Sequence, residues 1–238
     1  MIEIVPAIDI MDGRCVRLSQ GDFARKKEYP EAPESMAAAF ASAGVRRIHV
    51  VDLDGARAGR PCNLPVLERV ASAASVEIEW GGGIKTEDDV RAVLSAGASN
   101  VVCGTVAVRE PKTFIRWLEL FPGMVLGADV RGASLATDGW MKDSGKDIFE
   151  FVRLFPSLKE LIVTQISRDG MLAGPDVDLY SRLKAEFPAL VLTASGGVGS
   201  MADIIALQQS GADRAIVGKA IYENRITMEE IASWCARG

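Results

Sequence analysis

The chain has 238 residues, of which 48% are hydrophobic and 25% are charged, a composition typical of a globular protein with a substantial buried core. Its formal net charge is −5 and it has no run rich in Lys and Arg, which argues against nucleic-acid binding. No apolar run approaches the roughly 20 residues that span a membrane, and the N-terminus lacks the features of a signal peptide. We therefore expect a cytoplasmic protein with no membrane or nucleic-acid partner.

Short runs rich in β-branched residues alternate with longer amphipathic runs along the whole chain. In chain order, the predicted strands are Ile2–Asp9, Arg47–Leu53, Val76–Trp80, Asn100–Cys103, Met124–Val130, Glu160–Thr164, Val191–Ala194 and Arg214–Val217. The predicted helices between and after them are Ser35–Ala43, Pro65–Ser72, Glu87–Ala96, Pro111–Leu120, Asp147–Leu154, Asp178–Glu186, Ser200–Ser210 and Met228–Cys235. This alternation predicts an all-parallel sheet covered by helices.

Several of the predicted helices carry end signals. Thr86 and Ser200 precede acidic first turns, as N-cap residues do. Gly44, Gly97 and Gly211 follow helical runs, where glycine commonly ends a helix.

The second half of the chain repeats residues of the first half at one constant spacing. Gly82-Gly83, Asp89, Gly97-Ala98 and Gly104 recur as Gly196-Gly197, Asp203, Gly211-Ala212 and Gly218. A repeat this long indicates two fused half-domains rather than a solenoid. Two four-strand halves close naturally into a (β/α)8 TIM barrel, whose typical length is about 250 residues. We predict a single barrel over 1–238, with half-barrels at about 1–122 and 123–238.

Two aspartates end predicted strands, which is where catalytic groups of such barrels lie. Asp9 ends the first strand and Asp129 ends the fifth, so the two carboxylates are expected to face each other across the barrel mouth. Alternation along the first strand places Val5, Ala7 and Asp9 on one face.

Turns that contain glycine follow the third, fourth, seventh and eighth predicted strands. They are Gly82-Gly83, Gly104-Thr105, Gly196-Gly197 and Gly218-Lys219. Phosphate in these barrels is commonly bound after the last two strands, where glycine lets backbone N–H groups approach it closely. Each glycine alone could serve only a tight turn. Their repetition favours two phosphate sites on opposite sides of the mouth, and hence a bisphosphorylated small-molecule ligand.

Two carboxylates between two phosphate sites indicate general acid–base catalysis at the centre of the ligand. One carboxylate would be ionised and remove a proton, while the other would keep its proton through a raised pKa. An aldose–ketose rearrangement uses such a pair. A retaining glycosidase also uses two carboxylates, but it does not need two phosphate sites.

Cysteine and histidine usage excludes other chemistry. The four cysteines are scattered and His49 is the only imidazole, so neither a Cys/His metal site nor a serine–histidine triad is expected. His49 is interpreted as structural. Asp54 and Asp169, which occupy matching positions in the two halves, are interpreted as residues that hold their loops.

The segment 4–22 resembles the opening of the ProFAR isomerase (phosphoribosylformimino-AICAR-phosphate isomerase) family of histidine biosynthesis. Further similar segments follow in order at 50–56, 81–84, 102–105, 164–170 and 195–198, so the resemblance covers nearly the whole chain. It implies an isomerase that converts an aminoaldose into a ketose by an Amadori rearrangement, with Asp9 as the base and Asp129 as the acid. It also implies no cofactor, no metal and no obligatory protein partner.

The resemblance and the glycine turns together imply a set of substrate-binding residues. They are Arg17, Gly21, Gly82, Gly83, Gly104, Thr105, Trp140, Thr164, Gly174, Gly197 and Gly218. Trp140 is expected either to stack on the carboxamide ring or to anchor its loop. The segment Gly21–Lys27 is expected to be a loop that closes over the ligand. Departures from the family at Lys85, Gln165 and Met171 are expected to alter contacts with the substrate.

Three alternatives stay open. The cyclase subunit of imidazole glycerol phosphate synthase, a lyase with a glutaminase partner, shares the fold, the duplication and both aspartates. The segment Arg17–Phe23 favours the isomerase over that cyclase. A dual-substrate isomerase that also accepts phosphoribosyl anthranilate is the second alternative. A non-catalytic phosphate-binding barrel, in which both aspartates are structural, is the third.

Overall fold

The computed structural model describes residues 1–19, 22–137, 140 and 142–238. Within these ranges, eight parallel strands close into a barrel in the order β10–β11–β12–β1–β4–β5–β6–β7, with β7 paired back to β10. The barrel strands are β1 (Glu3–Met11), β4 (Arg47–Asp52), β5 (Glu77–Gly81), β6 (Asn100–Cys103), β7 (Met124–Arg131), β10 (Glu160–Gln165), β11 (Val191–Ser195) and β12 (Arg214–Val217). The predicted (β/α)8 barrel is confirmed, while its division into half-barrels stays a prediction.

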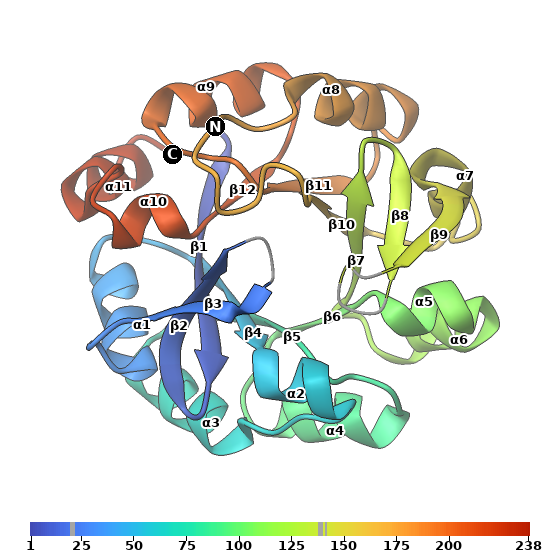
Figure 1. Ribbon diagram of the computed structural model, residues 1–238, viewed down its shortest axis with the longest axis horizontal. Coiled ribbons are helices and arrows are strands. Elements are labelled where there is room, and N and C mark those ends of the chain that lie inside the picture. The colour runs from blue at the N-terminus through green and yellow to red at the C-terminus, as the bar shows by residue number, and fades with distance from the viewer. Residues whose placement is uncertain (20–21, 138–139, 141) are drawn as a thin grey trace.

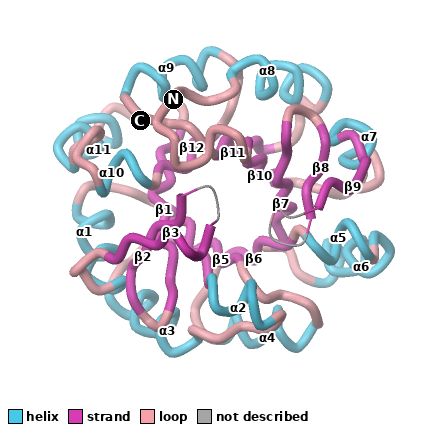
Figure 2. Tube along the Cα trace, viewed as in Figure 1, coloured by secondary structure: helices cyan, strands magenta, loops and turns pink. Residues whose placement is uncertain are grey.

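Helices form an outer ring around the barrel (Figures 1 and 2). Those that the amphipathic pattern predicted are α1 (Pro33–Ser42), α3 (Leu64–Ala73), α4 (Glu87–Ser95), α6 (Pro111–Leu120), α7 (Ile148–Val152), α8 (Val177–Glu186), α9 (Met201–Gln209) and α11 (Met228–Cys235). Three further helices begin at strand ends and are too short to show a helical period, namely α2 (Leu53–Ala58), α5 (Thr105–Arg109) and α10 (Lys219–Tyr222). Within the described ranges, none of these helices has the length and apolar character to cross a membrane.

The ends of the helices largely follow the predicted signals. Thr86 and Asp89 form a capping box at the start of α4. Gly44, Gly97 and Gly211 adopt positive φ angles of 83°, 111° and 88° after α1, α4 and α9, which glycine tolerates better than other residues. Ser200 occupies the N-cap of α9, but its hydroxyl donates to Asp203 instead of accepting from the helix backbone.

Two antiparallel hairpins extend from the barrel strands. Their strands are β2 (Arg14–Ser19) and β3 (Asp22–Glu28), which continue from β1, and β8 (Ser134–Thr137) and β9 (Lys142–Asp147), which continue from β7. The interpretation of Gly21–Lys27 as a loop was therefore wrong from Asp22 onward. This segment forms an edge strand, and its sequence lacks the alternation of apolar and polar residues by which a strand is recognised. Gly21 itself lies outside the described residues.

An apolar layer fills the middle of the barrel and is separate from the larger core between strands and helices. It consists of Val5, Ala7, Val125, Ile162 and Ile216, with Val102 packed against it. These side chains come from β1, β7, β10 and β12, with Val102 from β6, and together they fill the interior of the barrel. Any space above the layer therefore opens only at the C-terminal ends of the strands.

The first and last strands complete the ring. β1 pairs with β12 in parallel, with Glu3 opposite Arg214. The indole Nε1–H of Trp234 in α11 donates to the carbonyl of Ile2 at 3.0 Å. The two chain ends consequently lie near each other, as Figure 1 shows.

Candidate active site

A cavity of about 370 Å³ opens at the C-terminal ends of the barrel strands, a size typical of small-molecule sites. The predicted site residues on its wall are Asp9, Arg17, Gly82, Gly83, Gly104, Thr105, Asp129, Trp140, Thr164, Gly197 and Gly218. Gly174 is not among the residues that line this cavity, and its expected contact with the ligand stays a prediction. Its N–H donates to the carbonyl of Gly197 at 3.0 Å and thereby supports the loop that does line the cavity.

Asp9 forms an ion pair with Arg17 at the cavity wall. The Arg17 Nη1–H donates to Asp9 Oδ2 at 2.6 Å, and its Nη2–H donates to the carbonyl of Ala7 at 3.0 Å. The two side chains are only 14% and 16% exposed, so water screens their attraction little. The guanidinium thus fixes the position of the Asp9 side chain through a charge-assisted hydrogen bond.

Asp129 lies in a different electrostatic environment. Burial raises the pKa of its carboxyl group, against hydrogen bonds from the side chains of Trp140 and Thr164 and the charge of a protonated His49. A buried carboxyl group with a raised pKa can hold its proton and act as a general acid. Trp140 has a φ of 74°, which is uncommon outside glycine, and its side chain hydrogen-bonds to Asp129.

Asp169, after β10, is a third carboxyl group on the cavity wall. Burial raises its pKa to about 6, while the charge of Arg17 lowers it and the charges of Asp9 and Asp129 raise it further. The interpretation of Asp169 as a loop-holding residue missed this exposure to the cavity. Its place just beyond the end of a barrel strand, the signal that selected Asp9, would have found it.

Asp54, its counterpart in the first half, does hold its loop. Its Oδ2 accepts from the backbone N–H of Asp12 and from the side-chain amide of Asn63, each at 2.8 Å. In the second half, loop support comes instead from Gln165, whose amide donates to Asp176 at 2.9 Å. Asp169 differs from Asp54 in that it lines the cavity.

Of the three departures from the family, only one reaches the cavity. Lys85 lies on its wall. Gln165 is buried beneath the loop that it supports and Met171 is exposed to solvent, and neither lines the cavity. The expected effect of Gln165 and Met171 on the substrate therefore stays a prediction, and it would have to act through the loops that carry them.

Two parts of the cavity wall, on opposite sides of the barrel mouth, each combine a glycine turn with a basic side chain. At Gly197, φ is 92° and a Cβ atom would lie 2.4 Å from the carbonyl oxygen of Gly174, so only glycine fits. Next to this turn, Lys219 lines the cavity and its Nζ donates to the carbonyl of Gly170 at 2.9 Å. Lys85 lies beside Gly82 and Gly83 in the same way. Each glycine turn is thus accompanied by a cation, which is the combination that binds phosphate.

The match to a family model covers residues 3–227 and carries the description histidine biosynthesis protein. The chain belongs to this family. Similar members include proteins of Bacteroides fragilis, 46% identical over 98% of this chain and 100% of the relative, and of Cytophaga hutchinsonii, 41% identical over 99% of this chain and 100% of the relative. Each relative is named 1-(5-phosphoribosyl)-5-((5-phosphoribosylamino)methylideneamino)imidazole-4-carboxamide isomerase.

A protein of Bacteroides thetaiotaomicron with the same name is 46% identical over 97% of this chain and 98% of the relative. These similarities confirm that this member of the histidine biosynthesis family is an isomerase, as its opening segment indicated. They favour the isomerase over the cyclase and over a non-catalytic barrel.

Proposed function

We propose that this protein converts ProFAR, the aminoaldose after which its relatives are named, into the corresponding ketose. That name contains two 5-phosphoribosyl groups, so the compound carries a phosphate at each end. One observation supports the proposal above all others. A single cavity joins the two aspartates to glycine turns and cations on both sides, and so matches a ligand that is held at its ends and reacts between them.

The proposed reaction begins when Asp129 donates a proton to the ring oxygen of the ribosylamine. The bond between C1 and this oxygen breaks, and the nitrogen lone pair forms a protonated imine with C1. Asp9 then removes the proton from C2, and the electrons of the C–H bond form the enolamine. When C1 gains a proton and the C2 hydroxyl loses one, the ketose forms and both carboxyl groups regain their starting states.

The assignment of the acid rests on burial. Burial raises the pKa values of both Asp129 and Asp169, the latter to about 6, whereas Asp9 differs from them in forming a close ion pair with Arg17. Asp129 is on β7 and Asp9 is on β1, and these two strands lie on opposite sides of the closed barrel. We therefore propose Asp9 as the base and Asp129 as the acid, and Asp169 is the residue that would replace Asp129 if the assignment of the acid is wrong.

An ultraviolet assay with purified protein and ProFAR tests the function. We expect turnover by the protein alone, because one chain supplies both carboxyl groups and both phosphate sites. Consumption of ProFAR is not expected to change when a glutaminase subunit is added. Product formation only with glutaminase or ammonia would instead identify a cyclase, and turnover of phosphoribosyl anthranilate would identify the dual-substrate isomerase.

A matched set of variants tests the residue roles. Asp129→Asn and Asp169→Asn are compared in the same assay, with Asp54→Asn as a control because Asp54 occupies the position in the repeat that corresponds to Asp169 and only holds its loop. The proposal expects the greatest loss of kcat with Asp129→Asn. A larger loss with Asp169→Asn would transfer the acid role to Asp169.

A further inference from the structure

His49 connects the cavity to a buried carboxylate deeper in the barrel. Its ring lines the cavity wall, and its Nδ1 atom lies 2.9 Å from Oε1 of Glu79. Glu79 stands opposite His49 in the register of β4 and β5, and it is fully buried. The imidazole therefore has one nitrogen bound inside the barrel, and its remaining edge faces the site.

Glu79 is ionised in spite of this burial. Desolvation alone would raise the pKa of its carboxyl group, but the hydrogen bond and charge of His49 and the charge of Arg47 outweigh it, and the pKa is lowered. A carboxylate can only accept hydrogen bonds. When the His49 ring is neutral, its one proton must therefore lie on Nδ1, where it is donated to Glu79, and Nε2 is the atom left for the cavity.

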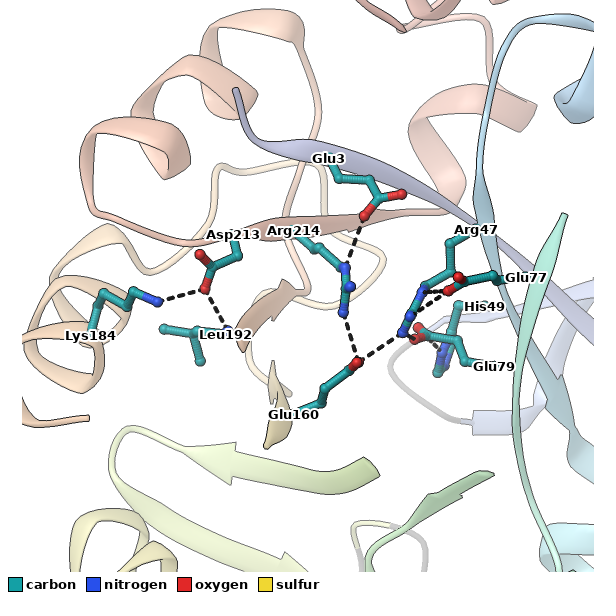
Figure 3. A network of polar contacts seen from close by, with 10 residues as sticks. All are labelled: Glu3, Arg47, His49, Glu77, Glu79, Glu160, Lys184, Leu192, Asp213 and Arg214. Atoms are coloured by element: carbon teal, nitrogen blue, oxygen red, sulfur yellow. Dashed lines mark hydrogen bonds and ion pairs between the residues drawn. The ribbon is translucent and has the colours of Figure 1, made fainter. Parts of the chain in front are cut away.

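A network of ion pairs holds Glu79 in place (Figure 3). Its Oε2 accepts from Arg47 Nη1 at 3.2 Å, and the same nitrogen donates to Glu160 at 2.8 Å. Arg214 donates to Glu160 at 2.7 Å and to Glu3 at 2.9 Å. Apart from Glu79, these residues are the first of their strands, so the network lies at the closed end of the barrel.

Burial of the Glu79 carboxylate inside the barrel has a desolvation cost, which an apolar side chain would not have. Replacing a buried ion pair by apolar side chains of similar volume is often neutral or stabilising. Glu79 stands opposite His49 in the register, and His49 stands opposite Ala7 of the apolar layer, so an aliphatic side chain at this place would pack without desolvating a charge. Its contact with a cavity-lining imidazole gives this carboxylate a role that no aliphatic residue could perform.

We propose that Glu79, held by Arg47, is a positioning residue for the isomerase reaction: it fixes the tautomer and the orientation of His49 so that Nε2 faces the bound sugar phosphate. When the ring is neutral, Nε2 is a hydrogen-bond acceptor for a substrate hydroxyl or N–H group. This inference deepens the proposed function, and its kinetic test rests on that function.

The sole histidine of the chain makes the tautomer directly measurable. Two-bond proton–nitrogen correlation spectra of protein labelled with 15N-histidine, recorded where the ring is neutral, report which nitrogen carries the proton. We expect the Nδ1–H tautomer in the unaltered protein. In Glu79→Gln, the amide oxygen should turn to Arg47, which can only donate, and the amide NH2 should turn to His49 Nδ1. The ring should then switch to the Nε2–H tautomer.

Glu160→Gln is the matched control. Glu160 contacts Arg47 and Arg214 but not His49, so its variant weakens the same network without changing the partner of the imidazole. We expect the Nδ1–H tautomer to persist in Glu160→Gln. An Nδ1–H tautomer in Glu79→Gln as well, or a switch in both variants, would overturn the proposal.

A double-mutant cycle provides the kinetic arm. Misplacement of a group that contacts the substrate costs roughly 10–100-fold in rate, so we expect Glu79→Gln to lower kcat/KM by about that factor. If Glu79 acts through His49, the same change should have little further effect in a His49→Gln background. An equal loss in both backgrounds would show a merely structural role and overturn the proposal. If the unaltered protein does not convert ProFAR, the proposed function fails, while the tautomer measurement still tests the positioning of His49.

Discussion

Gly104 and Gly218 occupy matching positions in the repeat, yet their replacement by alanine should have opposite consequences. Both have ordinary negative φ angles, −116° and −112°, so alanine introduces no backbone strain at either. At Gly218 the new Cβ would lie 1.8 Å from Nη2 of Arg17, the flexible end of a side chain. At Gly104 it would lie 2.7 Å from the carbonyl oxygen of Gly127, which belongs to the barrel backbone.

The size of each effect depends on which group the new Cβ atom displaces, the side chain of Arg17 or the backbone of Gly127. Gly218→Ala displaces the guanidinium and breaks its bond of 2.6 Å to Asp9, a charge-assisted contact worth about 1.5–3 kcal/mol, or roughly 10–150-fold in kcat/KM. Gly104→Ala forces two barrel strands apart, and such overpacking costs about 1–3 kcal/mol of unfolding free energy. For a chain of this size that corresponds to a Tm lower by about 2–12 °C.

The ultraviolet assay and thermal unfolding by circular dichroism, applied to both variants, separate the two effects. Gly218→Ala should lose kcat/KM and lower the Tm less than Gly104→Ala does, because water in the open cavity can solvate the displaced guanidinium, whereas Gly104→Ala should lose Tm. In an Arg17→Met background, Gly218→Ala should cause no further loss of activity, because the group that it displaces is absent. Unaltered kcat/KM in Gly218→Ala, or equal Tm losses in the two variants, would refute the reasoning.

Three further predictions concern the acidic residues and the thiols. Asp9→Asn and Asp129→Asn should each lower kcat by about 10²–10⁴-fold with little change in KM, measured by steady-state kinetics; near-normal turnover in either would remove that residue from the mechanism. Because the pKa of Asp169 rises from 3.8 to about 6 on folding, its ionisation destabilises the folded chain progressively as the pH rises through that window. Asp169→Asn should therefore raise the unfolding free energy by about 1–3 kcal/mol at pH 8 but not at pH 4, and an equal effect at both would contradict this linkage. The exposed thiol of Cys62 should react with a disulfide reagent in the native protein, whereas Cys15, whose pKa burial raises to about 12, should react only on unfolding.

The barrel could be predicted from the sequence because its strands and helices have clear periods and end signals. The capping box at Thr86 and the positive φ of Gly97 are local features, set by neighbours in the chain. The hairpin that contains β3 was missed because its pairing with β2 depends on the position of β1, and because its residue sequence shows no alternation of polar and apolar residues. The short helix α10 was missed because one turn of helix is shorter than the period that would reveal it.

The sequence could predict those site residues whose location depends only on their position along a strand. Asp9 and Asp129 were found by the rule that strand ends face the mouth, and they do line the cavity. The different roles of Asp54 and Asp169 could not be predicted from their positions after strands. They depend on contacts made by residues distant in the sequence, such as the hydrogen bond from Asn63 to Asp54. The contact between His49 and Glu79 was likewise hidden, since it requires the register of two strands whose pairing the sequence does not state.

Closure of the barrel between β12 and β1 has a consequence for how the chain could be connected. The contact between β12 and β1 is held by backbone pairing and by the ion pair of Arg214 with Glu3 at 2.9 Å. The hydrogen bond from Trp234 to Ile2 adds to it. A peptide link across the two neighbouring ends, with new ends opened between α6 and β7, would preserve each of these contacts. Such a circular permutant should fold to the same barrel and keep the same cavity, since the contacts around the ring do not depend on where the polypeptide is cut.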